Sequence, residues 1–187
     1  MTAFEYTSVM ASIILGLGLV DVMVSANRLI RAGKLVRWDW AAPVASVLVV
    51  LTLLQIWWSL YRPHDQPMTI GEFLPLFVEL TLLFLLAAAA LPDEVGPEGV
   101  DLKAYYDRNG PYFWALFTAA LAWTLIMGAA PALMSGAILD ALGDRLMDFG
   151  VVAVFASLIF IRKRWWHALA FVFLSVGPIG WLSKSLG

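Results

Sequence analysis

The stretch Asn109–Leu139, NGPYFWALFTAALAWTLIMGAAPALMSGAIL, decides the fold, because its 31 residues include no Asp, Glu, Lys or Arg. A transmembrane helix needs roughly 20 predominantly apolar residues. A second uncharged stretch of 22 residues runs from Trp40 to Tyr61. Two such segments in a chain of 187 residues predict that the chain crosses a lipid bilayer more than once.

The composition points the same way. Hydrophobic residues make up 61% of the chain, the mean hydropathy is +0.83, and charged residues account for 14%, whereas about 25% of a soluble domain is charged. Little of the sequence is left for a water-soluble domain. The chain has no cysteine, which excludes disulfides, thiolate metal sites and cysteine nucleophiles.

We therefore predict an all-α membrane protein in which residues 1–187 form one polytopic domain with six transmembrane helices. The basic residues near the first span follow its apolar core, unlike those of a signal peptide, so we expect this span to remain uncleaved. The fifth span is the shortest and should tilt, borrow neighbouring turns or pack against other helices. The predicted spans are Phe4–Ile30, Ala41–Tyr61, Gly71–Leu91, Pro111–Leu133, Leu146–Ile161 and Trp166–Lys184.

The distribution of Lys and Arg predicts the orientation. Nine basic residues fall in the connections 1–2, 3–4 and 5–6, and three fall on the opposite side, so the positive-inside rule puts both termini outside a bacterial inner membrane. The nine are Arg28, Arg31, Lys34, Arg37, Lys103, Arg108, Arg162, Lys163 and Arg164. A 3+3 inverted repeat, as in many transporters, is a weaker hypothesis because the two halves share little sequence.

Several short motifs carry a resemblance to a known group. They are SIILGLG at Ser12–Gly18, the pair Trp57-Trp58, Ala90-Leu91-Pro92, and DLKAYY at Asp101–Tyr106 followed by Phe113-Trp114. Together they resemble a widespread family of small bacterial integral membrane proteins with six helices, over roughly residues 1–120. The resemblance implies the fold and the membrane location, and it brings no established activity or catalytic residue.

Two acidic residues, Asp21 and Glu79, lie well inside predicted spans. An ionised Asp there costs at least about 2.5–3.5 kcal/mol, so such groups usually face the bundle interior or a watery cavity. Counting about 1.5 Å per residue places Glu79 and Gln55 at similar depths, roughly 12 and 9 Å below the outer face, and Asp21 about 22 Å below it. We expect Gln55 rather than Asp21 to be the partner of Glu79.

Asp21 shares a helical face with Gly18, Ser25 and Arg28. One interpretation is a polar path lined by Glu79, Gln55, Asp21 and Ser25. The alternative, which we favour for Asp21, is a residue near the inner interface that Arg28 or a basic loop neutralises.

The last predicted span contains Gly177-Pro178-Ile179-Gly180. A helix broken at Gly177, Pro178 and Gly180 would leave backbone groups free to bind an ion or substrate, as in transporters. An ordinary proline kink is the simpler interpretation.

Motifs for catalysis are absent from the sequence. His64 and His167 are the only histidines and fall at opposite ends of the predicted spans, so we expect no haem, no metal site and no other cofactor. The sequence has no nucleophile elbow, zinc-protease motif or phosphate-binding loop, and we do not expect an enzyme. The basic connections need no nucleic acid, because each Lys or Arg beside anionic lipid head groups gains about 1 kcal/mol.

Two functions remain. The first, which ranks ahead on the sequence, is a small transporter or channel for protons, cations or a small solute, and the second is a non-transporting scaffold, accessory or sensor-like module that acts through protein or lipid contacts. A water-accessible cavity lined by Glu79 and Gln55 would favour transport, and a dry centre with Glu79 turned to a neighbouring helix would favour the second. The small residues around Gly16 and Gly18 leave a homo-oligomer open.

Overall fold

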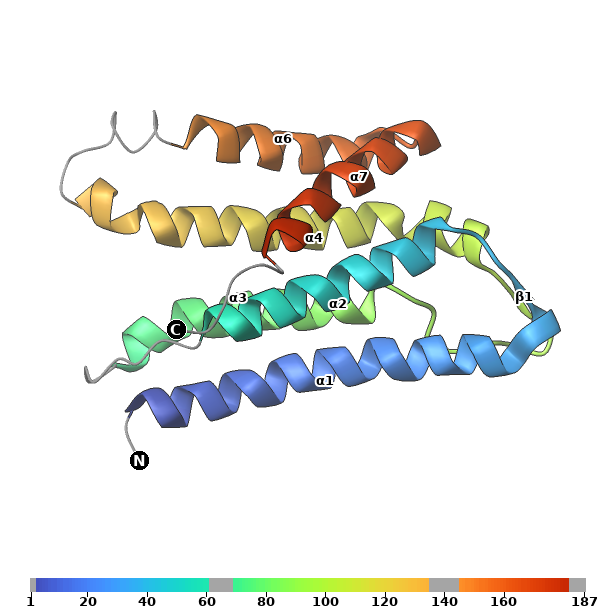
Figure 1. Cartoon of the computed structure of the whole chain (residues 1–187), viewed down its shortest axis with the longest axis horizontal. Coiled ribbons are helices and arrows are strands. Elements are labelled where there is room, and N and C mark those ends of the chain that lie inside the picture. The colour runs from blue at the N-terminus through green and yellow to red at the C-terminus, as the bar shows by residue number, and fades with distance from the viewer. Residues whose placement is uncertain (1–2, 61–68, 135–144, 182–187) are drawn as a thin grey trace.

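The computed structural model describes residues 3–60, 69–134 and 145–181, which form a bundle of long helices joined at one end by a very small sheet (Figure 1). The elements are α1 (Ala3–Ala32), η1 (Gly33–Leu35), β1 (Val36–Arg37), α2 (Ala41–Ser59), α3 (Ile70–Ala88), β2 (Val100–Asp101), α4 (Leu102–Met134), α6 (Leu146–Phe160) and α7 (Arg164–Trp181).

The described helices correspond in order to the six predicted spans. Among the described residues, three helical segments are long and apolar enough to cross a membrane: Thr7–Leu35, Ala41–Ser59 and Leu102–Ala130. Two shorter apolar segments lie at Phe73–Ala88 and Leu146–Phe160. The all-α architecture with membrane-spanning helices is thus supported, and the count of six spans stays a prediction.

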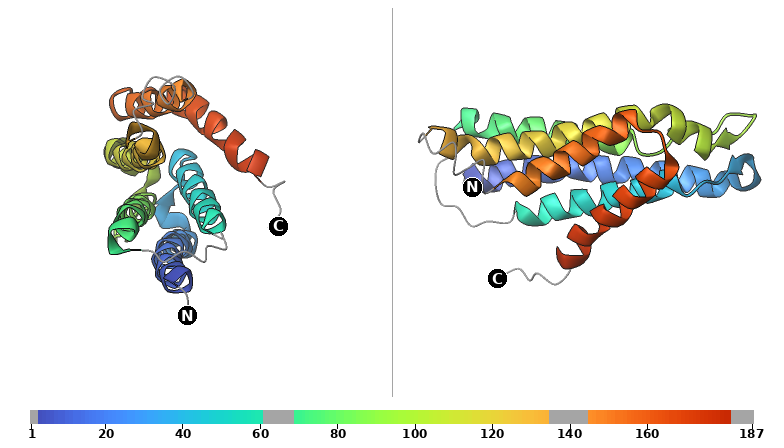
Figure 2. Two further views of the ribbon diagram at one scale, coloured as in Figure 1. Left: turned by 90° about the vertical axis from the view of Figure 1, so that its left-hand side faces the viewer. Right: turned by 90° about the horizontal axis from the view of Figure 1, so that it is seen from above.

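Successive helices alternate in direction (Figure 1). α1 packs along α3, α4 lies between α3 and α6, and α2 contacts α1, α4 and α7. α7 crosses the bundle obliquely (Figure 2). The described connections 33–40, 89–101 and 161–163 therefore gather at one end, which we call the connector end. These are the three connections that the basic residues predict to lie on one side of the membrane.

The start of the fourth helix differs from the prediction. The predicted span begins at Pro111, but α4 is one helix of 33 residues from Leu102 onward. At 1.5 Å per residue it is about 50 Å long, which exceeds the roughly 30 Å hydrocarbon core. Asp101 explains the start, because its carboxylate Oδ1 accepts a hydrogen bond of 3.0 Å from the Ala104 N–H and so caps the helix.

α6 is the shortest of the described α-helices, as expected for the fifth span. Its 15 residues rise about 22 Å, and it packs along α4. This packing answers one of the three expectations for a short span. This span was also expected to extend into the neighbouring turns, and those before Arg145 lie outside the described residues.

The centre of the bundle is apolar. Leu80, Leu86, Val49 and Trp114 are among the fully buried side chains. Among the described residues, the buried polar or charged ones are Ser25, Ser46 and His167. Hydrophobic side chains also dominate outward-facing positions, for example Ile13, Leu17, Val20 and Met23 on α1, Leu74 and Val78 on α3, and Val172 and Phe173 on α7. An apolar exterior around an apolar core is typical of helices surrounded by lipid.

Two close approaches depend on glycine. β1 and β2 pair in parallel, with Val36 opposite Val100, and Gly99 enters β2 with φ +82° while its backbone lies against the Leu35 carbonyl. A side chain there would collide with Leu35, and the positive φ also disfavours other residues. In the bundle, a Cβ on Gly18 would lie 3.3 Å from the Ala87 Cβ, so this glycine sets the separation of α1 and α3.

Candidate functional site: polar groups at two levels of the bundle

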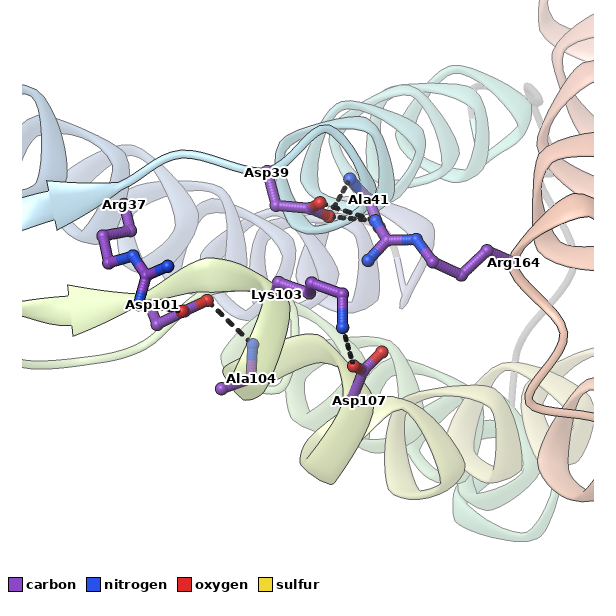
Figure 3. A network of polar contacts seen from close by, with 8 residues as sticks. All are labelled: Arg37, Asp39, Ala41, Asp101, Lys103, Ala104, Asp107 and Arg164. Carbon is purple, nitrogen blue, oxygen red and sulfur yellow. Dashed lines mark hydrogen bonds and ion pairs between the residues drawn. The ribbon is translucent and has the colours of Figure 1, made fainter.

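Ion pairs tie the connections together at the connector end (Figure 3). Arg164, at the start of α7, donates from Nη2 to both carboxylate oxygens of Asp39, at 2.5 and 2.6 Å. Asp39 Oδ1 also accepts from the Ala41 N–H at 3.1 Å, and the Arg164 Cζ lies 5.5 Å from the centre of the Trp40 ring. This clamp joins the first connection to the last.

A second ion pair strengthens the small sheet. Arg37 lies 3.2 Å from Asp101, and these residues are also opposite one another in the β1–β2 register. The carboxylate of Asp101 accepts from Ala104 while facing Arg37, and this hydrogen bond and ion pair hold the pKa of Asp101 below its usual range. The first and second connections are therefore joined by strand pairing and by an ion pair.

Beneath these ion pairs lies a buried hydrogen-bond network of three aromatic residues. The Trp114 Nε1–H donates to the Tyr106 hydroxyl at 2.9 Å, and the Tyr106 hydroxyl lies 2.9 Å from Nδ1 of His167. On the other side of the ring, His167 Nε2 lies 2.9 Å from the Ile161 carbonyl oxygen. Because a carbonyl only accepts, Nε2 carries the hydrogen, and Nδ1 accepts from Tyr106. Every polar atom of the network is satisfied.

Cavities at this end are of two kinds. A small cavity of about 20 Å³ beside the network has room for about one water molecule. Two open grooves of about 480 and 410 Å³ lie on the surface of the connections. The first groove is lined by Asn27, Arg28, Arg31, Asp93, Glu94 and Val95.

Glu79 occupies a different level. It is the tenth of the 19 residues of α3, about 13 Å from either end of the helix. Its Oε1 lies 2.9 Å from the Thr124 hydroxyl on α4, and one turn away the Trp123 Nε1–H donates to the Pro75 carbonyl at 2.8 Å. These two contacts form a polar seam between α3 and α4. Trp123, a tryptophan in the middle of its predicted span, is thus held by a neighbouring helix.

Among the described residues, no hydrogen bond joins any two of the predicted polar residues Glu79, Gln55, Asp21 and Ser25. The partner of Glu79 is Thr124, and among the described residues no hydrogen bond joins Glu79 to Gln55, which is half-buried on α2. Depth alone did not identify Thr124, because depth gives the height of a residue and not the side of the helix on which it lies. Ser25 is buried and Asp21 is half-buried, both on α1.

Arg28 makes a contact that the sequence did not predict. Its Nη1 donates to the backbone carbonyl of Asp93, at 2.6 Å, and so fastens α1 to the second connection. Gly177, Pro178 and Gly180 lie within α7, which is assigned as one helix through Trp181. His64 lies outside the described residues, and no group of three or more His, Cys, Asp or Glu among the described residues is arranged to hold a metal ion.

Sequence reasoning missed the partners of both polar sites. In the sequence, Tyr106 and Trp114 stood out only as parts of the motifs that carry the resemblance, and His167 was considered only as a haem or metal ligand. A signal existed, because all three fall near the inner ends of predicted spans and each has a polar tip that needs a partner when buried. Thr124 gave no such signal, since a threonine in a helix commonly bonds its own backbone.

Taken together, the fold and these sites define a mostly helical protein with three helices long and apolar enough to cross a membrane, a packed apolar centre and a charged connector end. Comparisons of the chain with family models, with curated proteins and with solved structures found no match.

Proposed function

We propose that this chain is a multi-pass protein of a bacterial inner membrane, with six spans and both termini outside. The apolar exterior of the bundle supports the membrane setting, and the nine basic residues of the predicted inner connections support the orientation. The resemblance to the family of small six-helix membrane proteins remains part of this proposal. An inverted repeat gains no support, because the two halves pack differently. In the first half α1 packs mainly on α3, its third helix, whereas in the second half α4 packs mainly on α6, its second helix.

Within that setting, we favour a non-transporting module that acts through protein or lipid contacts. The observation that carries this choice is the centre of the bundle, where the buried residues that the structure describes are apolar except for Ser25, Ser46 and His167. A solute path needs groups that replace water along its length. Glu79 is turned to Thr124 on a neighbouring helix instead.

The connector end is the natural contact surface of such a module. Its connections are fixed to one another by the Asp39–Arg164 and Arg37–Asp101 pairs, so they present charged grooves of defined shape. Exposed basic side chains there would meet anionic lipid head groups at the predicted inner face.

Orientation can be tested directly because the chain has no cysteine. A single cysteine at Gly96, an exposed position with open space around it, should be protected from a membrane-impermeant maleimide in intact spheroplasts. A single cysteine at Thr69, before α3, should react. The reverse pattern would overturn the orientation, and release of the protein by carbonate washing would overturn the membrane assignment.

Transport is the second candidate, and the specific observation in its favour is a carboxyl group at the midpoint of α3. In proteoliposomes under a proton or cation gradient, the wild-type chain should leak no more than empty liposomes if it is a contact module. A flux that disappears in Glu79→Gln would replace our first choice with transport.

A further inference from the structure

The geometry of the α3–α4 seam points to a proton-binding site. We propose that Glu79 is held as the protonated acid and that it donates its hydrogen to Thr124, at a position open to the lipid. This inference rests only on the membrane-spanning part of the proposed function, and it holds for either mode of action.

The count of hydrogens is the first argument. The Thr124 Oγ1 lies 2.9 Å from Glu79 Oε1 and 3.0 Å from the Ala120 carbonyl oxygen. A hydroxyl has one hydrogen, and an ionised carboxylate and a carbonyl are both acceptors only. With Glu79 ionised, one hydrogen would have to serve two acceptors. With Glu79 protonated, Glu79 donates to Thr124 and Thr124 donates to Ala120, so both short contacts are full hydrogen bonds.

The absence of a nearby counter-ion is the second argument. Each ion pair between described residues lies at the connector end. Residues 41–59 of α2 and 109–130 of α4 carry no charge. α1 contributes Asp21, another acid, and its cations Arg28 and Arg31 fall in its last two turns, where Arg28 binds the Asp93 carbonyl at the connector end. Arg145, which precedes α6, donates hydrogen bonds from its guanidinium to the carbonyl oxygens of Leu125 and Gly128 on α4. A carboxylate at the middle of a membrane helix without a cation is costly, and protonation removes that cost.

The seam also faces outward. Thr124 is exposed and Glu79 is half-buried. Their neighbours Val78 and Ile126 are exposed apolar side chains, which in a membrane protein means that they face lipid. The proton site is thus reached from the hydrocarbon side of the bundle, where lipid-soluble reagents concentrate.

A hydrophobic carbodiimide is the matching probe, because it reacts with protonated acids. The acid proton goes to one carbodiimide nitrogen, the carboxyl oxygen adds to the central carbon, and the acyl group then migrates to nitrogen, so the adduct keeps all atoms of both reactants. In membranes, dicyclohexylcarbodiimide should label Glu79 at least tenfold faster than Asp101 and Asp107 at the connector end, as read by peptide mass spectrometry. Equal labelling, or no labelling of Glu79, would overturn the proposal.

Infrared spectroscopy tests the hydrogen bond independently. The wild-type protein in liposomes should show a carbonyl stretch of a protonated carboxylic acid that disappears in Glu79→Gln. The band should move to higher frequency in Thr124→Val and stay in place in Thr124→Ser, which keeps the hydroxyl. Thr118→Val is the matched control, because Thr118 makes the same backbone bond to Trp114 without a carboxyl partner.

The outcomes separate the two proposals. If Glu79 has no protonated band in a chain that resists carbonate extraction, the proton site fails and the membrane assignment stands. If Thr124→Val leaves the band unmoved, the hydrogen-bond scheme is wrong. Extraction of the chain by carbonate would remove the membrane assignment itself.

Discussion

Gly16 and Gly18 lie two positions apart on α1 and meet different surroundings. A Cβ on Gly18 would come within 3.3 Å of Ala87 and 3.6 Å of Leu53, whereas a Cβ on Gly16 would meet no atom within 4 Å. The sequence marked both as one small-residue surface. Only Gly18 lies at such a contact. Where two helices approach closely, there is space for the hydrogen of a glycine but not for a larger side chain.

Alanine substitutions should therefore act in opposite directions. Gly18→Ala should lower the free energy of unfolding by about 1–3 kcal/mol, as overpacking does. Gly16→Ala should raise it by about 0.4–1 kcal/mol, because alanine restricts the unfolded chain. Unfolding by SDS titration in mixed micelles measures both. Equal effects of the two substitutions would contradict the packing described for α1 and α3.

The buried network at the connector end gives a second contrast. Tyr106→Phe removes one hydroxyl, but the Trp114 Nε1–H keeps His167 Nδ1 as an acceptor at 3.1 Å, so we expect a loss of about 1 kcal/mol. His167→Phe leaves the Tyr106 hydroxyl without its acceptor and the Ile161 carbonyl without its donor. Each of these orphaned groups costs about 1–3 kcal/mol.

The same SDS titration ranks the two variants. A larger loss from Tyr106→Phe than from His167→Phe would contradict the proposed direction of the hydrogen bonds.

At the N-terminus of α4, Asp101 combines three roles, since it ends β2, caps the helix and pairs with Arg37. The pKa of Asp101 is lowered, chiefly by the Ala104 N–H and further by the Arg37 guanidinium. A carboxyl group with a lowered pKa in the folded state stabilises the fold above its ordinary pKa, and this contribution is lost as the pH falls.

We expect Asp101→Asn to lower the thermal unfolding midpoint at pH 7, because asparagine can cap a helix but carries no charge. The difference from the wild type should shrink as the pH falls below about 4, where Asp101 itself becomes protonated. Asp101→Ala should be less stable than Asp101→Asn at every pH. A difference between wild type and Asp101→Asn that grows on acidification would contradict the assigned sign.

The helices themselves were largely predictable from the sequence, and their ends were not. Apolar stretches placed the six described α-helices in order, because helical geometry satisfies backbone polar groups inside lipid. The beginning of α4 at Leu102 was missed, since it depends on the Asp101 cap and on a sheet partner, Val36, that is 64 positions away in the sequence. Two-residue strands give no recognisable pattern of their own.

The assembly of the bundle depends on long-range contacts at the connector end. Asp39 and Arg164 are 125 positions apart, and their contact holds α7 to the start of α2. The Asp39 side chain is 15% exposed and the Arg164 side chain 34% exposed, so the pair is only partly screened by water. Hydrogen bonds to charged groups contribute about 1.5–3 kcal/mol each.

A double-mutant cycle of Asp39→Asn and Arg164→Gln should give a coupling energy of about 1–3 kcal/mol. Arg164→Lys should recover only part of the loss, because lysine cannot reproduce the planar contacts with the carboxylate and Trp40. Lys103→Gln and Asp107→Asn are the matched control, since this pair is exposed and local, and its coupling should stay below about 0.5 kcal/mol. Equal coupling in the two cycles would contradict the clamp.

The sequence by itself determined the apolar, helical character of the chain and the order of the helices, and it predicts the membrane setting and the side on which the basic connections lie. These follow from hydrophobicity and charge, which are summed along the chain and need no knowledge of neighbours. Only the tertiary structure decided that Glu79 meets Thr124, that His167 meets Tyr106 and Trp114, and that Asp39 meets Arg164. Each of these contacts depends on the rotation of one helix about its axis relative to another, and packing between residues far apart in the sequence sets that rotation.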